Sequence, residues 1–159
     1  IWLASKFDCM GMFNSETNQT EDYCDAEIGS VLGILQLERD SSQNIIGAVD
    51  SFDYSSLEGS IYTDSSVPSP HKAKQLSFVE MGDQYSIKIA IIPRKEGIYG
   101  IFLGGGIGKL KGKCYCDGTA GFGFTVANKE TNIDLYENFL SPEPVPDGDI
   151  GVGYFFEVQ

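Results

Sequence analysis

A series of short apolar segments rich in β-branched residues, each ending in a polar or glycine-containing turn, is the feature that most limits how this chain can fold. The run over 28–37 ends in the turn cluster 38–42. Residues 84–92 alternate apolar and polar side chains directly after Gly82-Asp83, which predicts a hairpin with 73–81. Such segments, repeated along a chain, are typical of an all-β fold.

Counting the segments gives about eight strands at a spacing of roughly ten residues, which predicts an antiparallel barrel, with a sandwich as the alternative. We expect residues 1–25 to form an irregular cysteine-containing arm and residues 26–159 to form a single domain. Residues 131–140 fit a helix or a strand, and we favour a helical turn because Thr131 and Asp134 have capping-box spacing. Further strands are expected over 44–54, 57–63, 98–103, 109–116, 121–127 and 150–158.

The balance of charge and hydropathy excludes several classes of protein. The 159 residues include 23 Asp and Glu against 11 Lys and Arg, a formal charge of -12. A surface of this sign repels phosphates, so we expect no nucleic-acid partner. No apolar run approaches the roughly 18 residues of a spanning helix, so we expect no membrane span. The 42% of apolar residues can build one core.

The four cysteines, Cys9, Cys24, Cys114 and Cys116, are disulfide candidates. Together with a first residue, Ile1, that is not Met, they predict a processed protein that is secreted, extracellular or in an organelle lumen such as the thylakoid lumen. Cys114 and Cys116 would share one face of a strand, so a bond between them would be strained. Cys9 and Cys24 could each bond to one of that pair, or to each other.

Asn18-Gln19-Thr20 is an acceptor sequence for N-linked glycosylation. It lies in the polar stretch 14–22, which is typical of a surface loop. Asn18 is therefore a glycosylation candidate.

A glycine-rich segment follows the predicted strand 98–103. Residues 105–112 read Gly-Gly-Ile-Gly-Lys-Leu-Lys-Gly. Over about residues 98–118, this segment resembles the glycine-rich strand pair of the allene oxide cyclase and dirigent β-barrel superfamily. The resemblance implies a barrel whose cavity binds or guides a small hydrophobic molecule. Aromatic residues that could line such a cavity are Phe78, Tyr85, Phe102, Phe122, Phe124, Tyr154 and Phe156.

The chain carries no recognisable catalytic or cofactor motif. The glycine-rich segment lacks the following helix of a dinucleotide site, and Cys114-x-Cys116 lacks the usual spacing of zinc ligands. His71 is the only histidine, and no Gly-x-Ser-x-Gly elbow accompanies it. We therefore expect no cofactor and no metal, and we favour a non-enzymatic role.

Lysines concentrated in the second half of this acidic chain predict a docking surface for an acidic protein partner. A row of outward lysines could instead protect an edge strand from unwanted pairing. The residues concerned are Lys109, Lys111, Lys113, Arg94 and Lys95, with nearby Lys88. The sequence therefore favours an interaction or structural subunit of a larger luminal or extracellular assembly, with a barrel for a hydrophobic ligand as the alternative.

Overall fold

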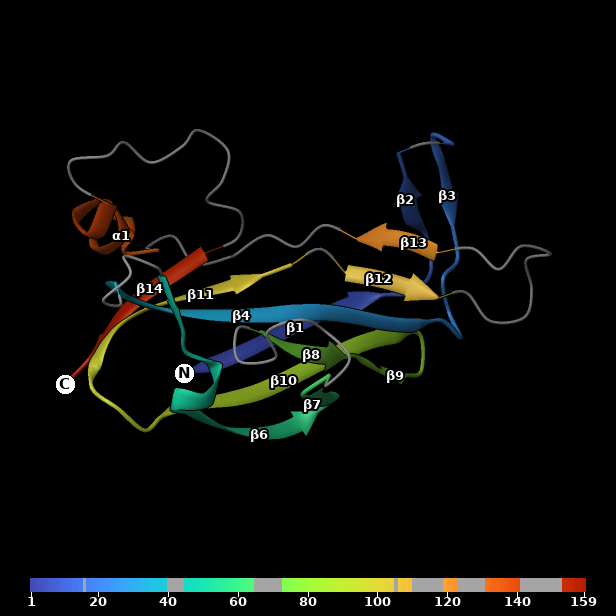
Figure 1. The fold of residues 1–159 in the computed structure, drawn as a ribbon. Helices are drawn as coiled ribbons and strands as arrows, with labels where there is room; N and C mark the ends of the chain where they lie inside the picture. The colour runs from blue at the N-terminus through green and yellow to red at the C-terminus, as the bar shows by residue number, and fades with distance from the viewer. Residues whose placement is uncertain are drawn as a thin grey trace.

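The computed structural model describes residues 1–15, 17–39, 45–64, 73–104, 106–109, 119–122, 131–140 and 153–159. Strands make up most of it, which confirms the all-β prediction (Figure 1). The elements of the first half are β1 (Trp2–Asp8), β2 (Met12–Asn14), β3 (Gln19–Glu21), β4 (Glu27–Arg39), β5 (Ile45–Gly47), η1 (Val49–Ser51), β6 (Phe52–Glu58) and β7 (Ser60–Tyr62). Those of the second half are β8 (Ala73–Ser77), β9 (Val79–Met81), β10 (Gln84–Pro93), β11 (Gly97–Leu103), β12 (Gly106–Lys109), β13 (Thr119–Phe122), α1 (Ile133–Leu140) and β14 (Gly153–Val158).

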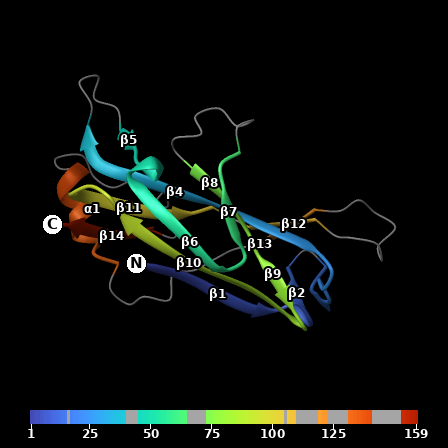
Figure 2. The same ribbon diagram turned by 90° about the horizontal axis from the view of Figure 1, so that it is seen from below.

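The strands form two main sheets and one small hairpin. The smaller sheet has the order β1-β10-β6, with β9 also paired to β10, and β2 pairs with β3 alone. The larger sheet has the order β13-β12-β4-β11-β14, with β5 and β8 on β4 and β7 on β8. Figure 2 shows β1, β10 and β6 side by side. Among the described strands no ladder joins the two main sheets, so closure into a barrel is not seen, and the layers fit the sandwich alternative equally well.

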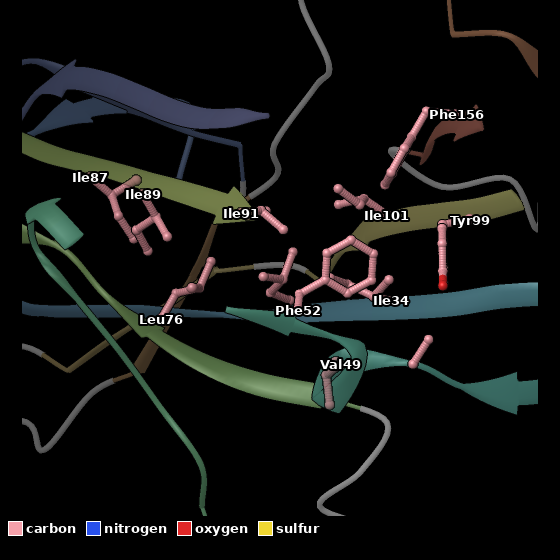
Figure 3. Packing of buried hydrophobic residues seen from close by; sticks show 12 residues of the cluster. Ile34, Val49, Phe52, Leu76, Ile87, Ile89, Ile91, Tyr99, Ile101 and Phe156 are labelled. Atoms are coloured by element: carbon pink, nitrogen blue, oxygen red, sulfur yellow. The ribbon is translucent and has the colours of Figure 1, made fainter. Parts of the chain in front are cut away.

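The core lies between the two sheets because their central strands bury every second side chain. In β10 the buried isoleucines are Ile87, Ile89 and Ile91, and in β4 Leu32 and Ile34 are fully buried opposite them. Figure 3 shows Ile34 and the three isoleucines of β10 together with buried side chains of β6, β8, β11 and β14. Their burial removes apolar surface from water, which is the main force holding the layers together.

The chain passes from one sheet to the other at two adjacent points. Gly59 separates β6 from β7, and Phe78 separates β8 from β9. Gly59 has a φ of +70°, and a Cβ there would lie 2.5 Å from the carbonyl oxygen of Ser77. Only glycine allows this close approach. The predicted strand 73–81 is therefore two strands, although the predicted turn at Gly82-Asp83 does join β9 to β10.

The N-terminal segment corrects the prediction of an irregular arm. β1 pairs with β10 along its whole length, from Trp2 opposite Ala90 to Asp8 opposite Gln84. Polar Ser5 interrupts the apolar alternation of this segment, so its period was not evident from the sequence. Backbone pairing with the central strand of the smaller sheet, available only in the fold, orders it.

The glycine-rich segment sits at a register shift. β11 and β12 pair with the same strand, Leu103 opposite Leu32 and Ile107 opposite Gly29. From Leu103 to Ile107 the chain advances by four residues, whereas the paired positions on β4, from Leu32 to Gly29, differ by three. The register between the two pairings therefore shifts by one residue.

The helical prediction for 131–140 is confirmed by α1, which covers part of the outer face of the larger sheet. The Asn132 side chain donates to the carbonyl oxygen of Phe155 in β14 at 2.8 Å, which ties the helix start to the sheet. Tyr136 stacks on Phe155 with ring centroids 5.0 Å apart, and Phe102 meets Phe155 edge-on at 5.7 Å. We call Phe102, Tyr136 and Phe155 the helix cluster, and within it Phe155 is completely buried.

Candidate functional site

The outer face of the smaller sheet carries the most distinctive group of exposed side chains. Because the odd-numbered residues 85–91 of β10 are buried, Lys88 and Ala90 point to the opposite side of the sheet. The register places Trp2 opposite Ala90 and Ala4 opposite Lys88, so these β1 residues share that side. The side chains of this outer face are Trp2, Ala4, Lys6 and Asp8 of β1, Lys88, Ala90 and Ile92 of β10, and Asp53, Ser55 and Glu58 of β6, which the register places opposite the β10 residues.

Trp2 is the aromatic anchor of the outer face. Its exposed fraction is 58%, and that of Ile92 is 49%. The Lys88 Nζ atom lies 5.4 Å from the centroid of a Trp2 ring, which is a cation–π distance. The Ile91 N–H donates to the carbonyl oxygen of Ile1 at 2.8 Å, so strand pairing extends past Trp2. The large exposed ring is therefore held on ordered backbone.

The outer face also presents positive charge. Lys6 and Lys88 are exposed, and within the described part of the chain neither ammonium group lies within ion-pair distance of a carboxylate. Arg94 differs, since it lies 3.6 Å from an oxygen of Asp53. The same face carries the carboxylates of Asp8, Asp53 and Glu58, which are bound by Gln84, Arg94 and Ser86 respectively. The two lysines are therefore the groups of this face that can attract an acidic partner.

The structure divides the cations that were predicted to form one strip. In the strand register the backbone of Lys109 lies opposite Glu27, the first residue of β4. Arg94 and Lys95 come just before β11, and β11 starts beside the other end of β4 (Figure 1). Arg94 and Lys95 therefore do not share a strip with Lys109. The docking role of the Lys109 strand stays a prediction.

Several sequence candidates fall beyond what the structure describes. The residues outside the described ranges are Lys111, Lys113, Cys114, Cys116, Phe124 and His71, while Lys109 and Phe122 are placed by their backbone.

The predicted cavity-lining residues belong to three separate packing groups. Tyr154 and Phe156 pack in or against the main core, and Tyr85 packs near the disulfide. Phe78 contacts both of these groups, and Phe102 lies in the helix cluster on the other side of the larger sheet. These side chains therefore fill the interior and the helix contact, and the structure does not bring them around one common space.

A polar cluster beside η1 was missed from the sequence. The Lys74 ammonium donates to the Thr63 hydroxyl at 2.7 Å and to an oxygen of Asp50 at 3.3 Å, and it lies 5.8 Å from the Tyr54 ring centroid. The Tyr54 hydroxyl donates to the carbonyl oxygen of Val49 at 2.6 Å. Burial, aided by the negative charge of Asp50, raises the pKa of Tyr54. These contacts hold η1 in place and join Lys74 to residues that lie far from it in the sequence. No local sequence pattern indicates them.

The opposite end of the molecule is closed by a disulfide. Cys9 and Cys24 are bonded, with Cα atoms 4.9 Å apart, which selects one of the connectivities left open by the sequence. Beside this bond, the buried Tyr85 hydroxyl accepts a hydrogen bond from the Ala26 N–H at 2.7 Å and lies 2.9 Å from the Tyr23 carbonyl oxygen. Burial raises the pKa of Tyr85 to about 12.

A possible metal cluster at this end has a different explanation. The sulfur atoms of Cys9 and Cys24 and an oxygen of Glu80 lie within 4.8 Å of one another. The two sulfurs are bonded to each other, so they do not offer the thiolates that zinc requires. Glu80 instead accepts a hydrogen bond from the Asp25 N–H at 3.0 Å, which is a structural contact.

Within the described residues, no helix has the length and apolar character needed to cross a membrane. Comparison of the chain with protein-family models, with curated proteins and with solved structures found no match.

Proposed function

We propose that this protein is a non-catalytic interaction subunit of a secreted or luminal assembly, and that it binds an acidic protein partner through the outer face of the smaller sheet. The observation that carries the proposal is the exposed Trp2 ring, ordered on a paired strand beside Lys88. Tryptophan is enriched among residues that dominate binding energy at protein interfaces.

The two chemical parts of the outer face have different roles. Trp2 and Ile92 supply apolar area that a partner can bury, and a large aromatic ring offers about 150–250 Å². Lys6 and Lys88 supply positive charge, which speeds encounter with an acidic surface and fixes its orientation. The partner surface should therefore contain an apolar pocket bordered by Asp and Glu.

The arrangement of the fold supports this choice of face. The helix cluster occupies part of the outer face of the larger sheet, where Phe155 is fully buried. On the smaller sheet, Trp2 and Ile92 are about half exposed to solvent. This contrast favours the smaller sheet as the contact surface.

The disulfide supports the proposed compartment. A bond between Cys9 and Cys24 persists in secreted or luminal compartments, where conditions are oxidising. We therefore place the assembly outside the reducing cytosol.

Site-specific photo-crosslinking tests the proposal. The full chain carries a benzophenone amino acid at position 2, or at position 62 as control, since Tyr62 is 53% exposed and lies on β7 of the larger sheet. Irradiation in an extract of the organism that makes the protein should give one discrete adduct from position 2. Mass spectrometry should locate this adduct on a partner peptide rich in Asp and Glu. Lys6→Glu with Lys88→Glu should abolish the adduct. Equal adducts from positions 2 and 62, or an adduct unaffected by both charge reversals, would contradict the proposal.

The alternative, a dirigent-like or allene oxide cyclase-like body that holds a small hydrophobic ligand, stays a prediction. The aromatic residues expected to line its cavity pack in separate groups among the described residues, so no specific observation favours it over docking.

A further inference from the structure

The hairpin of β2 and β3 lies inside the loop closed by the Cys9–Cys24 disulfide and stands away from the two main sheets (Figure 1). Asn18 lies in its turn, with a φ of +55°, directly before β3. Asn18, Gln19 and Thr20 are all exposed. The acceptor sequence is thus presented on a projecting turn, where an enzyme can reach both the Asn18 amide and the Thr20 hydroxyl.

Phe13 gives a second, independent observation at this place. Its exposed fraction of 68% is the largest among the large hydrophobic residues that the structure describes. Phe13 pairs with Thr20 across the hairpin, and paired residues of an antiparallel ladder project from the same face. The most exposed apolar ring therefore lies on the face that carries the acceptor threonine.

The other face of the hairpin is occupied by polar contacts. The Asn14 side chain donates to an oxygen of Glu21 at 2.9 Å and accepts from the Thr17 N–H at 3.3 Å. The Thr17 hydroxyl donates to the same Glu21 oxygen at 3.0 Å. These bonds hold the turn in place and leave the Phe13 face open.

We propose that Asn18 carries an N-linked glycan whose first sugar packs on the ring of Phe13. A pyranose has one face made largely of C–H groups, and covering an exposed aromatic ring with it removes apolar surface of both from water. The glycan thereby accounts for an exposed phenylalanine on a short hairpin.

The transfer step needs a lipid-pyrophosphate-linked oligosaccharide as donor. A bond forms between the Asn18 amide nitrogen and C1 of the first sugar, while the bond from C1 to the pyrophosphate oxygen breaks. The lipid pyrophosphate leaves and the amide loses one proton. Asn18 lies beyond the Asp8 end of β1, and Trp2 lies at the other end of this strand.

Expression of the full chain in the secretory pathway of mammalian cells tests the modification. Peptide-N-glycosidase in ¹⁸O-water converts a glycosylated asparagine to labelled aspartate, which mass spectrometry locates. We expect the label at Asn18 in the natural sequence and in Thr20→Ser, which keeps the acceptor motif, and its loss in Thr20→Ala. A secreted, disulfide-bonded natural chain with unlabelled Asn18 would overturn the proposal.

A second measurement tests the contact with Phe13. Enzymatic removal of the glycan should lower Tm by about 2 °C in the natural sequence, a shift on the scale of one weak contact in a chain of this size. The shift should disappear in Phe13→Ala and persist in the control Met10→Ala, since Met10 is exposed in the same disulfide loop but lies outside the β2–β3 pairing. An equal shift in both variants would overturn the packing on Phe13.

Discussion

Gly100 in β11 should not tolerate even a methyl group. A Cβ at this position would lie 2.9 Å from a ring carbon of Phe102 and 2.9 Å from a ring carbon of Phe155. Favourable carbon contacts are about 3.5–4.0 Å, so both rings would have to move by roughly half an ångström or more. Phe155 cannot yield easily, because it is fully buried and stacked on Tyr136.

The expected cost follows from two opposing effects. Overpacking a tight contact destabilises by about 1–3 kcal/mol. Replacing glycine by alanine also reduces the entropy of the unfolded chain, which returns about 0.4–1 kcal/mol. Gly100→Ala should therefore lower the free energy of unfolding by about 1–2 kcal/mol, and Tm by about 2–8 °C for a chain of this length.

Gly104→Ala is the matched control for this measurement. A Cβ at Gly104 would meet the Cβ of Val31 at 3.4 Å, close to an ordinary contact. Calorimetry should show a lower Tm for Gly100→Ala than for Gly104→Ala, and near-UV circular dichroism should report disturbance of the helix cluster. A Gly100→Ala protein that melts at or above the natural Tm, or no lower than the control, would refute the packing described for Phe102 and Phe155.

Two further predictions concern the disulfide end. Cys9→Ala with Cys24→Ala should lower the free energy of unfolding by about 3 kcal/mol, because the bond closes a loop with a sequence separation of 15; urea midpoints that do not change on reduction of the natural chain would contradict this. Since burial raises the pKa of Tyr85 from 10.0 to about 12, the folded state retains a proton that the unfolded state loses, and stability should fall as pH rises through that interval. Tyr85→Phe should flatten this decline without abolishing it, because the pKa of Tyr54 is also raised. The same substitution should lower the free energy of unfolding by about 1–3 kcal/mol at neutral pH, because it leaves the buried Ala26 N–H without its acceptor. A pH profile of Tm that does not change in Tyr85→Phe would contradict the raised pKa of Tyr85.

The sequence predicted those strands, turns and helices that depend on the preferences of neighbouring residues. The apolar run over 28–37 lies within β4, the Gly82-Asp83 turn joins β9 to β10, and α1 forms over 133–140. Backbone preference and the period of apolar residues act within a few neighbours, so these features appear in the sequence before any fold is known. The same holds for the acceptor motif at Asn18.

Tertiary structure decided what depends on partners far along the chain. β1 is a strand because β10 pairs with it, and the strand over 73–81 is divided at Phe78 because its halves join different sheets. The candidate docking face needed the register that places Trp2 beside Ala90.

The sequence by itself determined that the chain is acidic, all-β and rich enough in cysteine to form a disulfide. Only the fold decided that Cys9 bonds Cys24, that Phe102 lies under a helix while Phe156 lies in the core, and that Arg94 lies far from Lys109. The physical reason is that strand alternation assigns a side chain to one of two faces, whereas the sheet, neighbour and end of the molecule that it meets depend on long-range pairing.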